Sequence, residues 1–408
     1  MNTITIPRKS RLGHVLIPLP SSKSESNRAL IIDALTAGDN QLSNLAEARD
    51  TQTMIRLLQE DPETLDVLDA GTTMRFLTAY AALTNRTKTL TGTPRMCERP
   101  IGILVDALRS LGADIEYLGV EGYPPLRTKG FSSQLTDRLQ IRGDVSSQYI
   151  SALVMNAPLL PKGLTLELTG KIGSRTYIEM TLELMKEFGV NYTFEGNIIS
   201  IKPQSYQPTR FAVESDWSGA SYWFSLLACA EEGELYLTGL KANSLQGDSQ
   251  IVGIMDKLGV QSEFDPQGVR LTKKPIEGID HIDFTHCPDI AQTVAVTCAL
   301  LGRSCDFTGL ESLRIKETDR IDALQRELAK IHAGLEERQE GVFTLVPSHH
   351  LPDRVQIHTY DDHRMAMAFM PLMAKMEVVF DDPEVVNKSY PSFWKHVSLL
   401  GVEPLIQQ

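Results

Sequence analysis

The feature that most constrains the fold is a short pattern that recurs at the ends of predicted helices. A large apolar residue, a glycine and an Ala or Val stand together in Leu111-Gly112-Ala113, Phe188-Gly189-Val190, Leu258-Gly259-Val260 and Leu400-Gly401-Val402. A looser copy is His332-Ala333-Gly334-Leu335. The copies are roughly 70 residues apart, a spacing that indicates internal repeats. Glycine at such a position ends a helix in the left-handed conformation. The pattern therefore predicts an α/β protein built from several copies of one unit.

Polar and cationic residues gather at the opposite ends of these helices, where each helix is predicted to begin. The run Ser22-Lys23-Ser24-Glu25-Ser26-Asn27-Arg28, for example, leads into the apolar segment 29–35. Free backbone N–H groups at a helix start attract anions, and added cations strengthen that attraction. Eight cations share this placement: Lys23, Arg28, Arg75, Arg95, Lys316, Arg320, Arg364 and Lys388. If the helix starts face one way, these cations converge on a site able to hold two polyanionic substrates.

The densest of these starts is Leu313-Arg314-Ile315-Lys316-Glu317-Thr318-Asp319-Arg320. A predicted strand over 304–308 precedes it, and apolar residues at helical spacing follow it. We expect Lys316 and Arg320 to share one face of the helix, because residues four apart are neighbours there. With Glu317 beside them, the arrangement predicts an anion site whose carboxylate can move a proton.

Several of these residues, taken alone, have a simpler structural explanation. Four would be ordinary helix caps: Ser146, Ser174, Asp216 and Asp289. His363 would be a surface or packing histidine, and the methionines of 365–373 would fill the core. Cys97 would be an incidental thiol. The conjunction of eight cations at helix starts in an acidic chain nevertheless favours a functional site.

Length and composition exclude several classes of protein. A chain of 408 residues, 42% hydrophobic and 23% charged, suits a globular protein of more than one domain. No apolar run is long enough for a membrane span, and the first residues lack a signal-peptide pattern. A net charge of −12 argues against a nucleic-acid partner, and five scattered cysteines indicate reduced thiols in a cytoplasm. Since no Walker loop, dinucleotide fingerprint or metal-ligand spacing occurs, we expect chemistry without a metal or a cofactor.

Six motifs together resemble those of the 5-enolpyruvylshikimate-3-phosphate synthase family, in the order in which that family carries them. They are Ser22-Lys23-Ser24-x-Ser26-Asn27-Arg28, Ala70-Gly71-Thr72, Pro94-Arg95-Met96-x-Glu98-Arg99-Pro100-Ile101, Ser146-Ser147-Gln148, Lys316-Glu317-Thr318-Asp319-Arg320 and Asp362-His363-Arg364-Met365-Ala366-Met367. The last two motifs are highly specific in combination, and the resemblance covers nearly the whole chain.

The resemblance implies a two-domain α/β fold, an inside-out α/β barrel in which each domain has three βαβαββ-like units. The chain would cross between the domains twice. Residues 1–20 and 215–408 would form the domain that contains both termini, residues 21–214 would form the other, and the active site would lie in the cleft between them. The implied activity is transfer of the enolpyruvyl group of phosphoenolpyruvate to the 5-hydroxyl of shikimate 3-phosphate, with release of phosphate.

The matching positions also imply which residues bind each substrate. The contacts to shikimate 3-phosphate would be Lys23, Ser24, Arg28, Ser146, Ser147, Gln148, Ser174, Tyr177, Asp289 and Lys316. The contacts to phosphoenolpyruvate would be Lys23, Gly71, Arg95, Gln148, Arg320, Arg364 and Lys388. Asp289 would be the base that takes the 5-hydroxyl proton. Glu317, with Lys23, would be the acid that protonates the methylene carbon. Inhibition by glyphosate from the phosphoenolpyruvate side is implied as well.

Three places depart from the family pattern. Asp69 stands where the family often has Asn, and we expect no substrate contact from it because its carboxylate would repel phosphate. Ser312 stands where a polar amide is common, which leaves its contact open. Between Asp50 and Asp69 the chain is much shorter than usual, so the first repeat is expected to lack a pair of strands.

Two other functions stay open at this level. One is the related enolpyruvyl transferase that acts on UDP-N-acetylglucosamine; it places a reactive Cys where this chain has Pro94, and it lacks the Lys-Glu-Thr-Asp-Arg run. The other is a non-catalytic polyanion-binding relative, against which the joint presence of Lys23, Asp289 and Glu317 argues. For the expected enzyme we predict a cytoplasmic monomer with two small-molecule substrates, and no nucleic-acid or membrane partner.

Overall fold

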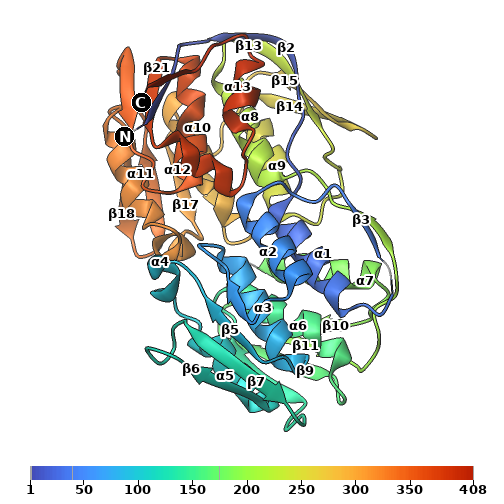
Figure 1. Cartoon of the computed structure of the whole chain (residues 1–408). Helices are drawn as coiled ribbons and strands as arrows, with labels where there is room; N and C mark the ends of the chain where they lie inside the picture. Colours follow the sequence, from blue (N-terminus) through green and yellow to red (C-terminus); the bar gives the residue numbers. More distant parts are fainter. Residues whose placement is uncertain (1, 39, 174, 408) are drawn as a thin grey trace. The chain divides into compact units, whose positions relative to one another are not determined.

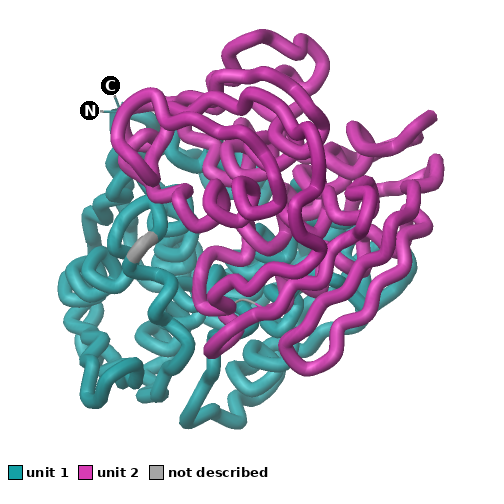
Figure 2. Tube along the Cα trace, turned by 90° about the horizontal axis from the view of Figure 1, so that it is seen from below, with its two compact units in different colours: residues 1–20, 214–408 teal, residues 21–213 magenta. Residues whose placement is uncertain are grey.

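The computed structural model describes residues 2–38, 40–173 and 175–407. The chain divides into two compact units: unit 1 consists of Met1–Pro20 and Glu214–Gln408, and unit 2 of Ser21–Val213 (Figure 2). Glu214 therefore belongs to unit 1 and not, as the sequence-based boundary has it, to the other part. The reason is that its carboxylate accepts hydrogen bonds from Trp217 Nε1 at 2.9 Å and from Ser244 Oγ at 2.6 Å, both of which lie in unit 1.

One βαβαββ arrangement occurs five times in the described chain, each time as a four-stranded sheet. The first two strands of each copy are parallel, and a helix leads into the second of them, because parallel strands need a crossover connection. The fourth strand pairs antiparallel with the second, and the third pairs antiparallel with the fourth. The repeats predicted from the glycine-ended helices are thus confirmed.

Unit 2 holds two of the complete copies (Figure 1). The first consists of β4 (Thr64–Asp66), α3 (Gly71–Leu83), β5 (Lys88–Thr91), α4 (Pro94–Cys97), α5 (Gly102–Leu111), β6 (Ala113–Tyr117) and β7 (Leu126–Phe131). The second consists of β8 (Arg138–Arg142), α6 (Ser147–Asn156), η1 (Ala157–Leu159), β9 (Leu164–Thr169), α7 (Arg175–Glu187), β10 (Thr193–Glu195) and β11 (Ile198–Ile201).

Unit 1 holds the other three copies, two of which use strands from the start of the chain. The first consists of β2 (Arg11–Ile17), α8 (Trp217–Cys229), β13 (Glu232–Thr238), η2 (Gly247–Gln250), α9 (Ile251–Lys257), β14 (Val260–Asp265) and β15 (Gly268–Lys273). The second consists of β16 (His281–Asp283), η3 (Pro288–Ile290), α10 (Ala291–Leu300), β17 (Cys305–Thr308), η4 (Glu311–Ile315), α11 (Arg320–Ala329), β18 (Gly334–Gln339) and β19 (Val342–Val346). The third consists of β20 (Arg354–Ile357), α12 (His363–Phe369), η5 (Met370–Ala374), β21 (Glu377–Asp381), η6 (Pro383–Lys388), α13 (Phe393–Ser398), β22 (Leu405–Gln407) and β1 (Thr3–Ile6).

The remaining repeat, in unit 2, is incomplete, as its short sequence predicts. Its sheet has only two parallel strands, β12 (Arg210–Ala212) and β3 (Gln41–Ser43). Its helices are α1 (Lys23–Leu35) and α2 (Arg49–Glu60). After α2 the chain enters β4 within a few residues, so no strand pair follows the second helix as it does in the complete copies.

The first helix of each repeat lies in the core of its unit. In unit 2, α1, α3 and α6 pack against one another; in unit 1, α10 packs against both α8 and α12 (Figure 1). Every residue of α10 is buried, and so is every residue of α12. A helix that is buried on all sides carries no solvent-facing polar stripe, which explains why apolar residues occur on every face of these two helices. The core-filling role predicted for the methionines of 365–373 is confirmed, since all of them are buried.

The glycines that end the second helices adopt the left-handed conformation predicted for them. The φ angles are 114° at Gly112, 82° at Gly189, 96° at Gly259 and 74° at Gly401. The looser copy differs: there His332 takes the positive φ, 59°, and Gly334 begins β18. The turn after α11 closes through a hydrogen bond from His332 N to Ala329 O at 3.1 Å, two residues before the glycine.

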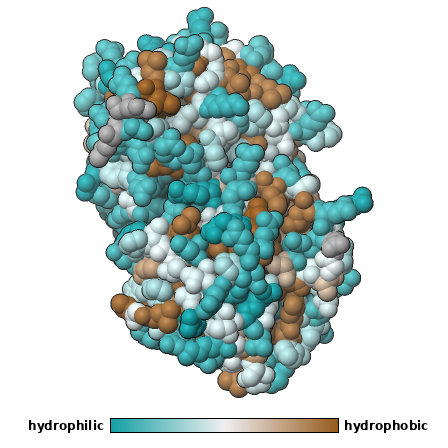
Figure 3. Space-filling view, in the orientation of Figure 1, coloured by the Kyte–Doolittle hydropathy of each residue, from teal (hydrophilic) through white to brown (hydrophobic). Residues whose placement is uncertain are grey.

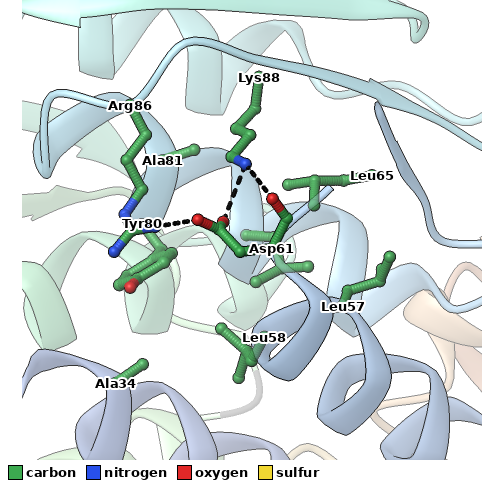
Figure 4. A pocket seen from close by; sticks show the side chains of 10 residues that line it. Ala34, Leu57, Leu58, Asp61, Leu65, Tyr80, Ala81, Arg86 and Lys88 are labelled. Carbon is green, nitrogen blue, oxygen red and sulfur yellow. Dashed lines mark hydrogen bonds and ion pairs between the residues drawn. The ribbon is translucent and has the colours of Figure 1, made fainter. Parts of the chain in front are cut away.

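A cavity of about 230 Å³ lies beside the incomplete repeat, lined by α1, α2, α3 and the start of β5. Figure 4 shows the side chains of Arg86 and Lys88 directed at Asp61, which ends α2. Each of the two cations forms an ion pair of 2.9 Å with that carboxylate. Partial burial by itself would raise the pKa of Asp61, but the two cations outweigh it and lower that pKa. The shortened connection is thus fixed to the neighbouring repeat by an ion-pair cluster.

The molecular face in Figure 3 is covered mostly by hydrophilic side chains, and its hydrophobic residues lie in several separate groups. Among the residues that the structure describes, none of the helices combines the length and the apolar character needed to span a bilayer.

Candidate active site

In unit 2 the start of α1 presents Lys23 to a buried carboxylate. Ser22 caps the helix, its hydroxyl accepting a hydrogen bond from Glu25 N. Lys23 Nζ lies 3.4 Å from Asp50 Oδ2 at the start of α2, and the Asp50 side chain is only 4% exposed. Thr73, at the start of α3, donates to the backbone carbonyl of Asp50 at 3.2 Å. The starts of α1, α2 and α3 therefore meet around Lys23.

Arg28 is buried one turn further along α1, and its guanidinium is held on several sides. It donates to Thr181 Oγ1 at 2.6 Å, to Ser151 Oγ at 3.2 Å and to the carbonyl of Tyr177 at 3.4 Å. The Phe76 ring lies 5.5 Å from its Cζ atom. Burial lowers the pKa of Arg28 to about 10, so the guanidinium remains a cation at neutral pH. The structure thus places Arg28 beside Tyr177, its expected companion in binding shikimate 3-phosphate.

The starts of α3 and α6 also meet. Gln148 Nε2 donates to Thr72 Oγ1 at 3.0 Å, so the two family motifs that contain these residues are in direct contact. Arg75 donates to the carbonyl of Gly71 at 2.9 Å and to that of Pro100 at 3.3 Å. Gly71 is packed tightly, because a Cβ atom added there would come within 2.8 Å of Arg75 Nη1.

Other predicted residues of unit 2 are placed differently. Ser146 caps α6 as expected, accepting from Gln148 N at 3.4 Å, and Ser147 is the buried first residue of that helix. Arg95 lies on the short helix α4, where its largely exposed side chain pairs with Glu98 at 3.0 Å. Ser174 lies outside the described residues.

In unit 1, Arg320 is the centre of a network of charged side chains. Its side chain is 2% exposed and faces three carboxylates. The distances are 2.7 Å from Nε to Asp362 Oδ2, 2.8 Å from Nη2 to Glu317 Oε2 and 3.3 Å from Nη1 to Asp289 Oδ1. Burial by itself would lower the pKa of Arg320, but the charges of Asp362 and Glu317 outweigh it and raise that pKa. The guanidinium is therefore a permanent cation that fixes the positions of these carboxylates.

The expected helical pairing of Lys316 with Arg320 is wrong. The helix α11 begins at Arg320, and Asp319 caps it by accepting hydrogen bonds from the backbone N–H groups of Ile321 and Asp322, both at 3.1 Å. An Asp in this position stops the helix from extending backward. Lys316 follows η4 in an extended conformation, and its Nζ lies 3.7 Å from Asp289 Oδ1.

Asp289 does not act as a helix cap, the structural alternative considered for it. Its carboxylate instead faces three cations: Arg364 Nη2 lies 3.1 Å from Oδ2, whereas Arg320 and Lys316 lie against Oδ1. Arg364 also donates to the backbone carbonyl of Asp289 at 3.2 Å. A carboxylate held this way has a fixed orientation.

Glu317 and Lys388 complete the cluster. Lys388 ends η6, and its Nζ lies 3.7 Å from Glu317 Oε1, although the two residues are far apart in the sequence. The Glu317 side chain is 17% exposed, so it is reachable from one side. Six residues predicted from the sequence are thereby joined in one contact network within unit 1: Asp289, Lys316, Glu317, Arg320, Arg364 and Lys388.

The chain is similar to known proteins over nearly its whole length. The sequence model of a family described as EPSP synthase (3-phosphoshikimate 1-carboxyvinyltransferase) matches residues 9–61 and 58–397. This chain belongs to the EPSP synthase family. It is 49% identical to a 3-phosphoshikimate 1-carboxyvinyltransferase of Bacteroides fragilis (strain YCH46), over 94% of this chain and 95% of that protein. A Vibrio cholerae serotype O1 (strain M66-2) protein of the same name is 36% identical, over 94% of this chain and 96% of that protein.

The EPSP synthase fold is supported by a structural match as well. An EPSP synthase from Acinetobacter baumannii has a TM-score of 0.82 to this chain, with 19% sequence identity and 100% of both chains covered. The predicted two-domain α/β fold and the predicted family are both confirmed. Because the matching family and relatives carry the EPSP synthase name, they favour this family over the related transferase that acts on UDP-N-acetylglucosamine. Cys97, the thiol that this alternative concerns, donates a hydrogen bond to the carbonyl of Gly92 at 3.7 Å.

Several carboxylates that lie beside the predicted site residues are not predicted from the sequence. Asp50 and Asp248 lie outside every recognised motif, and only tertiary contact brings each carboxylate to Lys23 or Arg364, respectively. Asp362 lies within a motif, but its sequence gives no sign that it would pair with Arg320 rather than only cap α12. Asp69, which we did not count as a ligand, pairs with Arg49 at 2.5 Å.

Proposed function

We propose that this protein transfers the enolpyruvyl group of phosphoenolpyruvate to the 5-hydroxyl of shikimate 3-phosphate, giving 5-enolpyruvylshikimate 3-phosphate and phosphate. The observation that carries the proposal is the unit 1 cluster. Four cations and the carboxylates Asp289 and Glu317 lie there in one contact network, in an EPSP synthase family chain. Both substrates are polyanions, and such cations would hold them together.

The two carboxylates suit the two proton transfers that the reaction needs. Glu317 would protonate the methylene carbon of phosphoenolpyruvate, assisted by Lys23, which makes the neighbouring carbon electrophilic. The 5-hydroxyl oxygen would attack that carbon as Asp289 takes its proton. The resulting intermediate then loses one methyl proton to Glu317 and its carbon–oxygen bond to phosphate, which leaves as inorganic phosphate. The Arg320 guanidinium lies against both carboxylates and would keep them correctly oriented throughout.

Residues of both units would act on the same substrates. The proposed shikimate 3-phosphate contacts belong partly to unit 2, as Ser24, Arg28 and Tyr177 do, and partly to unit 1, as Asp289 and Lys316 do. We also propose a cytoplasmic monomer, in keeping with reduced cysteines and small diffusible substrates.

The function is tested by the release of inorganic phosphate. The purified protein should release phosphate when phosphoenolpyruvate and shikimate 3-phosphate are both present, and not when either is left out. Replacing shikimate 3-phosphate by UDP-N-acetylglucosamine should abolish the release. Phosphate release with UDP-N-acetylglucosamine, or none with either acceptor, would contradict the proposal.

Lys388→Ala is expected to raise the KM for phosphoenolpyruvate by about 10- to 100-fold, the range that a hydrogen bond to a charged group is worth. Binding of shikimate 3-phosphate alone, measured by calorimetry, should change little, because Lys388 is not among its proposed contacts. Lys395→Ala, at an exposed lysine of the nearby helix α13, is the matched control. An equal loss of affinity for both substrates would overturn the assignment of Lys388 to phosphoenolpyruvate.

Gly71→Ala is expected to weaken inhibition by glyphosate by about 10- to 100-fold, the usual effect of overpacking by a methyl group. The wild type should be inhibited competitively with phosphoenolpyruvate. The added Cβ would lie 2.7 Å from Arg99 Nη1 and 2.8 Å from Arg75 Nη1, so these side chains must shift. A longer ligand should suffer more from that shift than phosphoenolpyruvate does.

The control for Gly71→Ala is Gly253→Ala in the helix α9, where an added Cβ would meet nothing within 4 Å. Inhibition constants and the KM for phosphoenolpyruvate, both measured at fixed shikimate 3-phosphate, decide the matter. A wild type that resists glyphosate, or equal losses for inhibitor and substrate in Gly71→Ala, would show that Gly71 does not wall this pocket.

A further inference from the structure

A buried carboxylate beside the unit 1 cluster has no part in the reaction described above. Asp248 lies in η2 and is 4% exposed. Its Oδ2 atom accepts a hydrogen bond from Ser218 Oγ, at the start of α8. Its Oδ1 atom is buried, and none of the described residues gives it a hydrogen bond. An ionised carboxylate with an unsatisfied buried oxygen is costly, so this environment favours the protonated form.

Ser218 connects Asp248 to the cluster. Arg364 Nη2 lies 3.4 Å from Ser218 Oγ and 3.1 Å from Asp289 Oδ2. The same guanidinium nitrogen therefore stands between two groups: the proposed base on one side, and a hydroxyl bonded to Asp248 on the other. Any added negative charge on Asp248 would draw Arg364 toward Ser218.

The charges that face Asp248 come from each of the elements packed around it. The carboxylate of Asp216 lies at the start of α8. The carboxylate of Asp289 and the thiol of Cys287 lie at η3, and the guanidinium of Arg364 belongs to α12. Burial, followed by the charge of Asp289, raises the pKa of Asp248 to about 7, although Arg364 and Ser218 oppose the shift. Burial also raises the pKa of Cys287, so that thiol stays neutral.

We propose that Asp248 is a positioning residue that controls, through Ser218, where the Arg364 guanidinium points. With its proton, Asp248 leaves Arg364 beside Asp289 and available to an anionic substrate. Without it, Asp248 competes with that substrate for the same guanidinium. The proposal rests on the proposed function, in which Arg364 holds phosphoenolpyruvate.

Two consequences follow from this competition. Because an anion bound to Arg364 removes the cation that stabilises ionised Asp248, binding of the anion should raise the pKa of Asp248 and take up a proton. In addition, kcat/KM for phosphoenolpyruvate should fall as the pH rises above about 7, since the ionised form then dominates.

The test compares the wild type with Asp248→Asn, which mimics the protonated carboxyl. Between about pH 7 and about pH 8.5, kcat/KM for phosphoenolpyruvate should fall in the wild type. The fall should be up to about tenfold larger than in Asp248→Asn, because the loss of one proton limits the slope to about tenfold per pH unit. The matched control is Asp216→Asn, which removes a neighbouring carboxylate, keeps a side chain able to cap α8 and should retain the fall. Calorimetry of glyphosate binding with shikimate 3-phosphate, in buffers of different ionisation enthalpy, should show less proton uptake for Asp248→Asn than for the wild type.

A second variant keeps the test decisive if Asp248→Asn does not fold. Ser218→Ala cuts the connection and should flatten the same alkaline fall. If the wild type turns over but both Asp248→Asn and Ser218→Ala keep its pH profile and its proton uptake, Asp248 does not position Arg364. A uniform rise in KM at every pH in Asp248→Asn would likewise overturn the proposal in favour of simple packing. A wild type without phosphate release would instead refute the proposed function itself.

Discussion

Replacing Glu317 by Gln is expected to lower kcat by about 100- to 10,000-fold, the usual range for removing an acid–base group. The amide keeps the size of the side chain and can still accept a hydrogen bond from Arg320 Nη2, which lies 2.8 Å from Oε2. It cannot give a proton to the methylene carbon. Binding of shikimate 3-phosphate should therefore persist, because Glu317 is not among the proposed contacts to that substrate.

The Glu317→Gln result is checked by steady-state kinetics together with calorimetry of shikimate 3-phosphate binding. Glu336→Gln, at an exposed carboxylate on β18, should leave both values unchanged. Near-normal turnover of a correctly folded Glu317→Gln protein would remove Glu317 from the mechanism.

Arg320→Met should lower the free energy of unfolding by about 3–5 kcal/mol, the cost of leaving buried charges without their partner. The side chain is 2% exposed and lies within 3.3 Å of three carboxylates, which the variant would leave facing one another.

Urea unfolding measures the Arg320→Met effect. Arg326→Met is the matched control on the same helix, since Arg326 forms an exposed ion pair with Asp322 at 3.0 Å. Such surface pairs contribute about 0–1 kcal/mol. If Arg320→Met destabilised no more than Arg326→Met, the cluster would not depend on Arg320 for its stability.

The repeat architecture could be predicted from the sequence because local signals encode it. A glycine such as Gly112 ends a helix through its own backbone conformation, and the short chain between Asp50 and Asp69 leaves no room for two strands. Cations at helix starts are equally local, and packing of the inner helices brings Arg364 to Asp289.

The features of the site that the sequence does not predict depend on tertiary contacts or on which residue caps a helix. Asp319 caps α11 and so removes Lys316 from the helix, although the spacing of charges favours a helical pair. Asp50 and Asp248 are separated in sequence from their partners and follow no motif. Whether such a carboxylate is buried beside a cation is decided by chain segments far from it.

Proton NMR of the reaction in D₂O tests the central claim most directly. Shikimate 3-phosphate and phosphoenolpyruvate, incubated with the wild-type protein, should give an enolpyruvyl ether and inorganic phosphate. If Glu317 protonates the methylene carbon and later takes a proton back, the vinyl hydrogens of the product must be partly replaced by deuterium. Phosphate release with fully retained vinyl hydrogens, or no product at all, would contradict this account.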